Sequence, residues 1–236
     1  MSGTLTDLRR LMEATWPPAR SWREGPFRLR DGAGGGKRVS AASAVGQWSV
    51  ADLDRLAPVG LVLIGAGDDA LDRALADRGW RIVDPVLAYA APLDQLMADL
   101  PPLAAFAHWP PLQIAHEIWA EGGIGPARLS VMERVAGDKV ALLARLGDRP
   151  AGVAFVARDG DDAMLHALEV RPPFRRQGVG RVLIQAAANW AGGLGAQRLS
   201  LVVTAQNHAG CALYARLGME VVGQYHYRMN DRGSLG

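Results

Sequence analysis

The clearest hydrophobic pattern lies in the last third of the chain. Apolar residues dominate the run 164–170, Met-Leu-His-Ala-Leu-Glu-Val, which stops at Arg171-Pro172-Pro173. This run predicts a strand that ends there, because proline cannot donate to a sheet ladder. Between Gly180 and Trp190 apolar residues recur at helical spacing before Gly192-Gly193, which predicts a helix. Residues 175–180 are therefore expected to form a loop between a strand and a helix.

The preceding and following segments extend this pattern into a sheet with helices. Helices are predicted at 114–119 and 127–135, strands at 140–146, 151–158, 163–170 and 199–203, and a further helix at 212–217. The turn signals Gly147-Asp148 and Asp159-Gly160-Asp161 are typical of hairpins, so the sheet is expected to begin antiparallel.

The first ninety residues contain a weaker copy of the same order. The pattern predicts a helix at 5–16, a strand at 22–30 with an antiparallel partner at 37–45, a helix at 50–56, a strand at 59–64, a helix at 69–78 and a strand at 81–90. When Gly79 is aligned with Gly218, helix, glycine and strand coincide at an offset of 139 residues. This order is also common among α/β proteins in general. Prolines between 91 and 111 place a boundary there, giving domains at 1–92 and 111–236 joined by a proline-containing connection at 93–110.

Composition narrows the class of protein. The chain has 236 residues, a formal charge of +2 and a single cysteine, Cys211. One cysteine excludes an internal disulfide and a cysteine-cluster metal site, and the small charge gives no sign of a nucleic-acid partner. The sequence has no apolar stretch long enough to span a membrane, and its N-terminus lacks a signal pattern, so a cytoplasmic protein is expected.

The loop at 175–180 has the features of an anion site. The first N–H groups of a helix have no intrahelical partner and attract an anion together with the helix dipole. Gly178 and Gly180 let an anion approach the backbone, and Arg175, Arg176 and Arg181 supply positive charge. The loop is neither a P-loop nor a complete dinucleotide fingerprint. An ordinary solvated basic turn is the alternative interpretation.

The residues around this loop resemble the GNAT superfamily of acyl-CoA-dependent N-acetyltransferases. Val170 and Pro172 precede Arg175-x-x-Gly178-x-Gly180, which fits the family's coenzyme A signature. The strand at 199–203 then leads to Asn207 and to Leu213-Tyr214-x-x-Leu217-Gly218-Met219, where Met219 replaces the usual Phe. The resemblance covers roughly residues 110–230. It implies an α/β (α+β GNAT) fold, with a mixed, mostly antiparallel sheet flanked by helices, and a degenerate GNAT-like N-terminal half that lacks the coenzyme A loop.

The resemblance also implies an activity and a cofactor site. The expected reaction transfers an acetyl group from acetyl-CoA to a primary amine of a small-molecule or peptide acceptor, without a metal, in a monomer or homodimer. In this family the strand before the loop splays from the next one, and the pantetheine arm lies in the gap. The residues expected to contact coenzyme A are Leu168, Glu169, Val170, Arg175, Arg176, Gln177, Gly178, Val179, Gly180, Arg181, Asn207 and Tyr214. Asn207 is equally suited to cap the following helix.

Acyl transfer to an amine needs a base for the ammonium and an acid for the departing thiolate. Tyr214 matches the family's acid; the alternative is a packed aromatic residue. For the base, His166 ranks first, a water chain second and Glu169 third. Strand alternation is expected to place His166 and Glu169 on opposite faces.

The acceptor site is the least defined part of the sequence. Residues in the positions that shape acceptor binding in the family are His116, Glu117, Trp119, the loop 121–125 and Tyr225-His226-Tyr227-Arg228. A catalytically silent acyl-CoA-binding sensor or interaction module is the alternative function, although it would have no need of an acid beside the sulfur.

Overall fold

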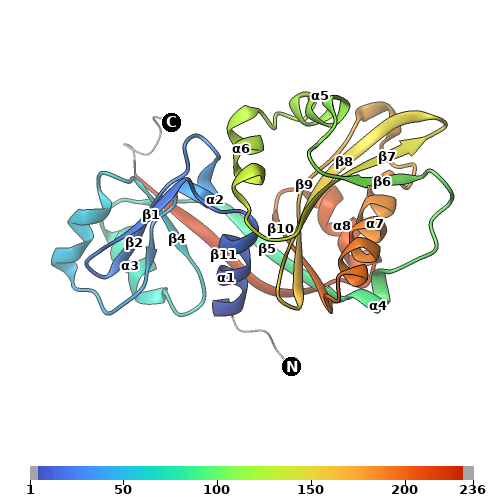
Figure 1. Ribbon diagram of the computed structural model, residues 1–236. Coiled ribbons are helices and arrows are strands. Elements are labelled where there is room, and N and C mark those ends of the chain that lie inside the picture. The colour runs from blue at the N-terminus through green and yellow to red at the C-terminus, as the bar shows by residue number, and fades with distance from the viewer. Residues whose placement is uncertain (1–4, 231–236) are drawn as a thin grey trace.

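The protein is built around one eight-stranded sheet, described here from a computed structural model over residues 5–230. Its strands are β4 (Leu61–Ile64), β5 (Arg81–Pro92), β6 (Ala105–His108), β7 (Lys139–Leu146), β8 (Arg149–Asp159), β9 (Asp162–Val170), β10 (Arg198–Thr204) and β11 (Glu220–Met229). The spatial order is β4-β11-β5-β10-β9-β8-β7-β6 (Figure 1). Within the described residues, β9 and β10 form the parallel pair of this sheet and the other neighbours are antiparallel. The predicted mixed, mostly antiparallel sheet is confirmed.

Helices cover both faces of the sheet. They are α1 (Leu5–Thr15), α2 (Lys37–Ser40), α3 (Asp69–Asp77), α4 (Leu93–Leu96), α5 (Gln113–Glu121), α6 (Pro126–Arg134), α7 (Val179–Gly193) and α8 (His208–Arg216), with 3-10 turns η1 (Val50–Leu56) and η2 (Pro172–Phe174). Alternation along the strands separates two cores: Leu142 packs with α4, α7 and α8, whereas Leu143 packs with α5 and α6. Helix α1 lies on the α5–α6 face, across the middle of the sheet (Figure 1).

The N-terminal region differs from its predicted elements. Instead of one strand at 22–30, it forms a hairpin of β1 (Arg20–Glu24) and β2 (Phe27–Asp31), which reverses at Gly25. Instead of a full returning strand at 37–45, it forms the short helix α2 and the two-residue strand β3 (Ser43–Ala44), which pairs with β2. The apolar alternation at 22–30 spans the turn, so it does not mark where the chain reverses.

Strand β5 comes from the N-terminal half of the sequence but lies between two strands of the C-terminal half, β10 and β11. Strand β11 in turn lies between β5 and β4. The two halves therefore share one sheet, in which each half places a strand inside the other. The segment 93–110 contributes α4 and β6, and β6 extends the same sheet at its far edge.

We call α3 with β5 and α8 with β11 the exchanged units, because each half places its strand inside the other half's part of the sheet. These two units repeat in register. Helices α3 and α8 both have nine residues and begin 139 residues apart, and each is followed by a glycine in the left-handed region, with φ of 80° at Gly79 and 79° at Gly218. The β10–β5 pair Leu201–Tyr89 has its counterpart at the same offset in the β4–β11 pair Val62–Arg228. Ladder positions on β5 and β11 are thus related by a local two-fold.

The strand order before these units repeats as well. In the N-terminal half, β1, β2 and β3 are antiparallel, and Ala42 beside β3 forms a parallel bridge with Val62 of β4. In the C-terminal half, β7, β8 and β9 are antiparallel, and β9 is parallel to β10.

Candidate functional site

A gap opens between β9 and β10 in the middle of the sheet. The two strands pair from Asp162–Arg198 to Leu165–Leu201, and no ladder pair joins them beyond that point in the described chain. Residues 166–170 of β9 and 202–204 of β10 therefore face each other without main-chain bonds across the gap. This is the splay that the family resemblance predicts between these two strands.

A β-bulge in β9 lies at the start of the gap. On the β8 side, His166 opposes Phe155 and Glu169 opposes Val153, so two residues of β9, Ala167 and Leu168, stand against one of β8. Ala167 has a positive φ of 50°. The fully buried indole of Trp119 donates to the Ala167 carbonyl at 2.8 Å (Nε1 to O), which holds the bulge from helix α5.

The bulge corrects the expected geometry of the two candidate bases. Phe155 and Val153 are two residues apart on β8 and share a face, so the residues opposite them, His166 and Glu169, share that face too. Glu169 lies against Gly122 at the end of α5, which is on this same side. The prediction that His166 and Glu169 point to opposite faces was wrong, because the extra residue in the bulge shifts the alternation by one.

The loop before α7 presents a row of backbone donors. Gly178 caps the helix with φ of 87°, a left-handed conformation that favours glycine. The first amide to bond along α7 is that of Val182, which donates to the Gly178 carbonyl at 3.0 Å. The N–H groups of residues 176–181 donate no hydrogen bond to any group within residues 5–230. These donors and the dipole of a 15-residue helix converge where an anion would bind.

The side chains of the loop have different tasks. Arg175 donates to the Val170 carbonyl at 2.9 Å (Nε to O) and to Glu169 at 3.0 Å (Nη2 to Oε1), so it ties the loop back to β9. Gln177 donates to the Pro173 carbonyl at 2.8 Å (Nε2 to O). Val179 is buried, whereas Arg176 and Arg181 are exposed and have no ion-pair partner among the described residues. The latter two are the charges that the loop holds out to an incoming anion.

Tyr214 lies on the α7 side of the gap. Its ring is 7% exposed and belongs to the same core as Leu168 of β9 and Val203 of β10. It packs at a centroid distance of 5.6 Å against Tyr89, which β5 brings in from the N-terminal half. Burial raises the pKa of Tyr214 to about 12. The phenol is therefore protonated at neutral pH, and its hydroxyl makes no hydrogen bond within residues 5–230.

Asn207 has one atom for each of its two predicted roles. Its Oδ1 accepts a hydrogen bond from the Gly210 N–H at 2.9 Å, so it caps α8. The side chain is exposed and its Nδ2 has no partner in the described chain. Capping leaves that amide free to donate to another molecule.

His166 lies on the opposite side of the gap, packed onto the end of α1. It is 3% exposed and stacks on Trp16 at a centroid distance of 4.9 Å. Thr15 uses its hydroxyl proton to donate to the Leu11 carbonyl at 2.7 Å, so the contact of 2.9 Å between Thr15 Oγ1 and His166 Nε2 must be donated by the ring. The other ring nitrogen, Nδ1, then accepts from Arg38 Nη1 at 3.0 Å, because guanidinium has no acceptor atom.

This network defines the ionisation of His166. Burial and the nearby Arg38 charge both lower its pKa well below the usual value of 6.5. The ring is neutral, with its proton on Nε2 and its lone pair directed at a cation. A base at this position would first need Arg38 to leave the lone pair.

A cavity of about 270 Å³ lies on the His166 side of the gap. Of the residues that the sequence favoured for the acceptor site, Ile124, Tyr225 and Tyr227 line it. Trp119 does not line the cavity, but its indole donates to the carbonyl of Ala167, which does. The N-terminal half forms a second part of the lining, and sequence reasoning named none of its residues for this site; they are Trp16, Gly35, Gly36, Lys37, Arg38, Asp84 and Val86.

The other predicted acceptor residues lie elsewhere. Glu117 is exposed and accepts from Gln113 on the surface of α5. His226 and Arg228 both bond Asp72 of α3, in the exchanged part of the sheet. These contacts lower the pKa of the Asp72 carboxyl, Arg228 having the larger effect.

The described part of the chain has neither a metal-binding cluster nor a membrane-spanning helix. Residues 5–230 contain no group of three or more His, Cys, Asp or Glu side chains placed to hold a metal ion. Within the same residues, no helix has the length and apolar character needed to cross a membrane.

Comparisons with known proteins agree with this geometry. The Acetyltransferase (GNAT) family matches residues 106–219. A Bacillus subtilis protein named uncharacterized N-acetyltransferase YobR is 25% identical, over 94% of this chain and 97% of its own. A GCN5-related N-acetyltransferase from Kribbella flavida has the same fold, with a TM-score of 0.74 and 18% identity over 100% of this chain and 98% of its own. A tandem GNAT protein from the clavulanic acid biosynthesis pathway has a TM-score of 0.60 and 15% identity, over 98% of this chain and 89% of its own.

The splayed sheet, the loop of free amides and the family match together define an acyltransferase. Residues 106–219 match the GNAT acetyltransferase family, and the fold of the whole chain is that of the GCN5-related N-acetyltransferase from Kribbella flavida. The family match extends from β6 to the start of β11, and so includes both the loop at 175–180 and Tyr214.

Proposed function

We propose that this chain transfers the acetyl group of acetyl-CoA to a primary amine of a small-molecule or peptide acceptor, in the cytoplasm. The observation that carries the proposal is the gap between β9 and β10, with a row of unpaired N–H groups on one side and a cavity on the other. The loop suits a pyrophosphate, because six successive amides and two exposed arginines converge on it. The gap suits a pantetheine arm, because β9 residues 166–170 have backbone groups without a ladder partner on that side.

Each predicted residue has a role in this reaction. The amine nitrogen bonds to the thioester carbonyl carbon as the carbon–sulfur bond breaks, and the sulfur takes a proton. We assign the donation of that proton to Tyr214, because its phenol, with a pKa raised to about 12, is protonated at every ordinary pH. Asn207 donates its free amide hydrogens to the pantetheine arm while it caps α8. Leu168 contributes backbone groups, whereas the Val170 carbonyl accepts from Arg175.

We rank His166 first as the base, on the condition that its contact with Arg38 is broken. His166 is still the only histidine beside the gap among the described residues, and it lines the acceptor cavity. Its lone pair accepts from Arg38, so it can take a proton only after that contact is broken. Water in the cavity is the second candidate, and Glu169, ion-paired with Arg175, is the third.

We further infer that residues 1–92 are a GNAT-like half without a cofactor site. The repeated strand order and the repeated register of the exchanged units support this inference. In the place of α7 the N-terminal half has η1, a 3-10 helix of seven residues. The Asp52 N–H in its first turn donates to the Ser49 carbonyl at 3.0 Å, and the Asp52 carboxylate accepts from the Ser49 N–H at 2.9 Å and from the Ser49 hydroxyl at 2.8 Å. A carboxylate at this position would repel a phosphate, so one coenzyme A per chain is expected.

The test is a thiol-release assay with acetyl-CoA and a panel of amines and peptides. Acetyl-CoA is expected to bind with about micromolar affinity by calorimetry. The Tyr214→Phe variant should lower kcat strongly, on the order of tenfold or more, and leave that affinity nearly unchanged. If acetyl-CoA binds but no acceptor releases thiol, the alternative of a silent acyl-CoA sensor is supported. Absence of binding would refute both.

A further inference from the structure

The acceptor cavity has an excess of positive charge. Its charged lining consists of Lys37, Arg38, Arg128 and Asp84. Lys37 and Asp84 neutralise each other in an ion pair of 2.5 Å (Nζ to Oδ2). Arg38 and Arg128 have no carboxylate partner among residues 5–230, and His166 beside them is neutral. Two cations therefore remain unbalanced in one small cavity.

Arg38 is the more informative of the two. It is half-buried, and its Nη1 donates a hydrogen bond to His166 Nδ1. Its Nε is buried and has no hydrogen-bond partner. A guanidinium offers five N–H donors, and buried donors are nearly always satisfied in native proteins. Because Arg38 also lines the cavity, its unsatisfied donor indicates an acceptor group that the chain itself does not supply.

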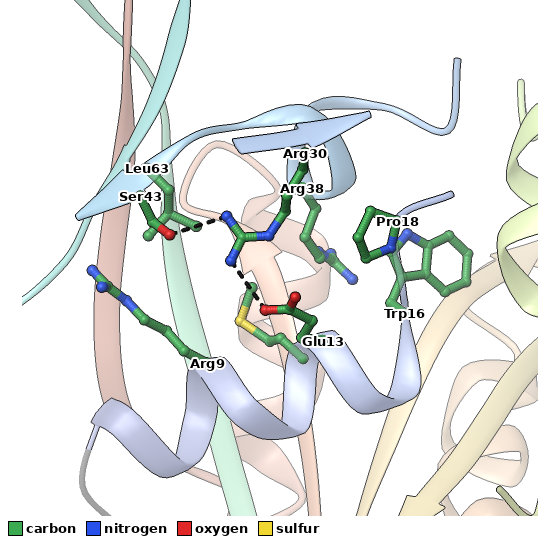
Figure 2. A pocket seen from close by; sticks show the side chains of 9 residues that line it. Arg9, Glu13, Trp16, Pro18, Arg30, Arg38, Ser43 and Leu63 are labelled. Carbon is green, nitrogen blue, oxygen red and sulfur yellow. Dashed lines mark hydrogen bonds and ion pairs between the residues drawn. The ribbon is translucent and has the colours of Figure 1, made fainter. Parts of the chain in front are cut away.

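The neighbouring Arg30 shows how this protein satisfies a structural arginine. Arg30 bonds the Glu13 carboxylate at 3.0 Å, the Ser43 hydroxyl at 3.0 Å and the Ala41 carbonyl at 2.9 Å. Figure 2 shows these two side-chain bonds, with Arg38 extending past them towards Trp16. Arg30 lies on β2 and Arg38 on the nearby helix α2, but of the two only Arg38 lines the acceptor cavity. Arg30, outside the acceptor cavity, thus has partners within the chain, whereas Arg38, which lines the cavity, has an unsatisfied donor.

We propose that the acceptor amine also carries a carboxylate, which Arg38 binds together with Arg128. The proposal rests on the proposed function, because it assigns a substrate class to the same site. A carboxylate would accept from Arg38 in the geometry that guanidinium favours, and Arg128 from α6 would complete the charge balance. The cavity volume of about 270 Å³ fits a small amino acid, and Tyr225, Tyr227 and Trp16 offer aromatic walls to its side chain.

The proposal places the N-terminal half in substrate selection. Arg38 follows the glycine-rich turn 32–36, which packs on α6: a side chain at Gly35 would lie 2.6 Å from Val131 Cγ2. The turn is thus held against the helix that carries Arg128. The two cations come from different halves of the chain and meet across the cavity.

The experiment compares each common α-amino acid with the amine that lacks only its carboxylate, such as L-phenylalanine with 2-phenylethylamine. Thiol release from acetyl-CoA is measured for both members of a pair, and the ratio of their kcat/KM values is taken for each enzyme. The wild type should favour the amino acid at least about tenfold, mainly through KM, as expected for a charged hydrogen bond. In Arg38→Met that ratio should fall to near one, and in Arg128→Met it should fall part of the way.

The control is Arg30→Met, which removes a half-buried arginine that does not line the acceptor cavity. It should lower stability yet keep the wild-type ratio, which is internal to each variant and independent of the folded fraction. A wild type without preference, or one that prefers a lysine-containing peptide, would overturn the proposal. So would a preference that survives in Arg38→Met.

Failure of acetyl transfer would be recognised separately. If no amine releases thiol, the same pairs are titrated calorimetrically into the wild type with coenzyme A present. Binding of an amino acid but not of its amine would keep the carboxylate site and refute only the enzymatic function. Binding of neither would overturn the proposal.

Discussion

The ionisation of His166 predicts a specific loss of stability in mild acid. In the native protein, burial and Arg38 keep the pKa of this ring well below its usual value of 6.5. In the unfolded chain the ring titrates normally. Below pH 6.5 the unfolded state therefore binds a proton that the native state does not, and stability falls as the pH falls. Well above pH 6.5 the ring is neutral in both states, so the stabilising contribution of His166 is fully present there.

The size of the effect follows from proton linkage. One pH unit corresponds to about 1.4 kcal/mol per proton, reached in full only well below the unfolded pKa. Between pH 7 and pH 5 the free energy of unfolding should therefore decrease by about 2 kcal/mol on account of His166, while the native ring stays neutral. Other groups titrate over the same range, so the effect has to be isolated by a variant.

The variant is His166→Gln, whose amide can bond Thr15 and Arg38 but does not titrate. Urea unfolding of both proteins at intervals from pH 7 to pH 5 gives the difference in free energy of unfolding, and that difference should shrink by about 2 kcal/mol as the pH falls. His116→Gln, on the half-exposed surface of α5, is the matched control, because it makes the same substitution at a histidine outside this hydrogen-bond network. NMR of the ring nitrogens should place the proton on Nε2.

Parallel curves for wild type and His166→Gln would refute this reasoning. They would mean that His166 takes a proton inside the native protein, and therefore that its Nδ1 is not held by Arg38 in solution. In that case the histidine would be free to act as the base without any rearrangement. The measurement thus decides between an accessible and an occupied lone pair.

Two further substitutions test the geometry of the cofactor side. Gly178→Ala places a Cβ in open space but at φ of 87°, so it should cost about 1 kcal/mol in unfolding free energy and weaken acetyl-CoA binding by calorimetry; Gly193→Ala, in the last turn of the same helix, should instead stabilise. An equal effect of both would contradict the left-handed cap. Trp119→Phe removes the donor to the Ala167 carbonyl and should cost about 1 to 3 kcal/mol in urea unfolding and raise the KM for the acceptor. Trp48→Phe should cost less, because the Trp48 indole donates no hydrogen bond within residues 5–230. Equal stability losses would show that the indole does not hold the bulge.

The sequence predicted the elements of the C-terminal half closely, because each is defined by local periodicity. The helix expected to begin at the loop glycines runs from Val179 to Gly193, and the hairpins at 147–148 and 159–161 reverse the chain as expected. Local signals failed at the bulge. Ala167 is not a glycine, and the donor that holds its carbonyl, Trp119, lies 48 residues away in the sequence. Nothing in the run 164–170 indicates that one residue is extra.

The individual residues of the cavity wall could not be identified from the sequence, for the same reason. Arg38 follows a glycine-rich turn that local pattern predicts to be flexible. Its surroundings are set by contacts with α6 and with His166, which is 128 residues away. The charge of a single arginine in a chain of net charge +2 gives no indication that it is half-buried without a carboxylate. Only the fold brings this information together.

Strand β5 joins the N-terminal half to both sides of the proposed site. Its residues alternate between the two sides of the shared sheet. Tyr89 packs against Tyr214 in the core beside the cofactor gap, whereas Asp84 and Val86 line the acceptor cavity on the opposite face. One strand from the first half thus supports the predicted acid and shapes the predicted acceptor site of the second. Because β5 also pairs with both β10 and β11, its removal would leave two strands of the catalytic sheet without their central neighbour. Under the proposed function the first half is therefore a structural part of the active site.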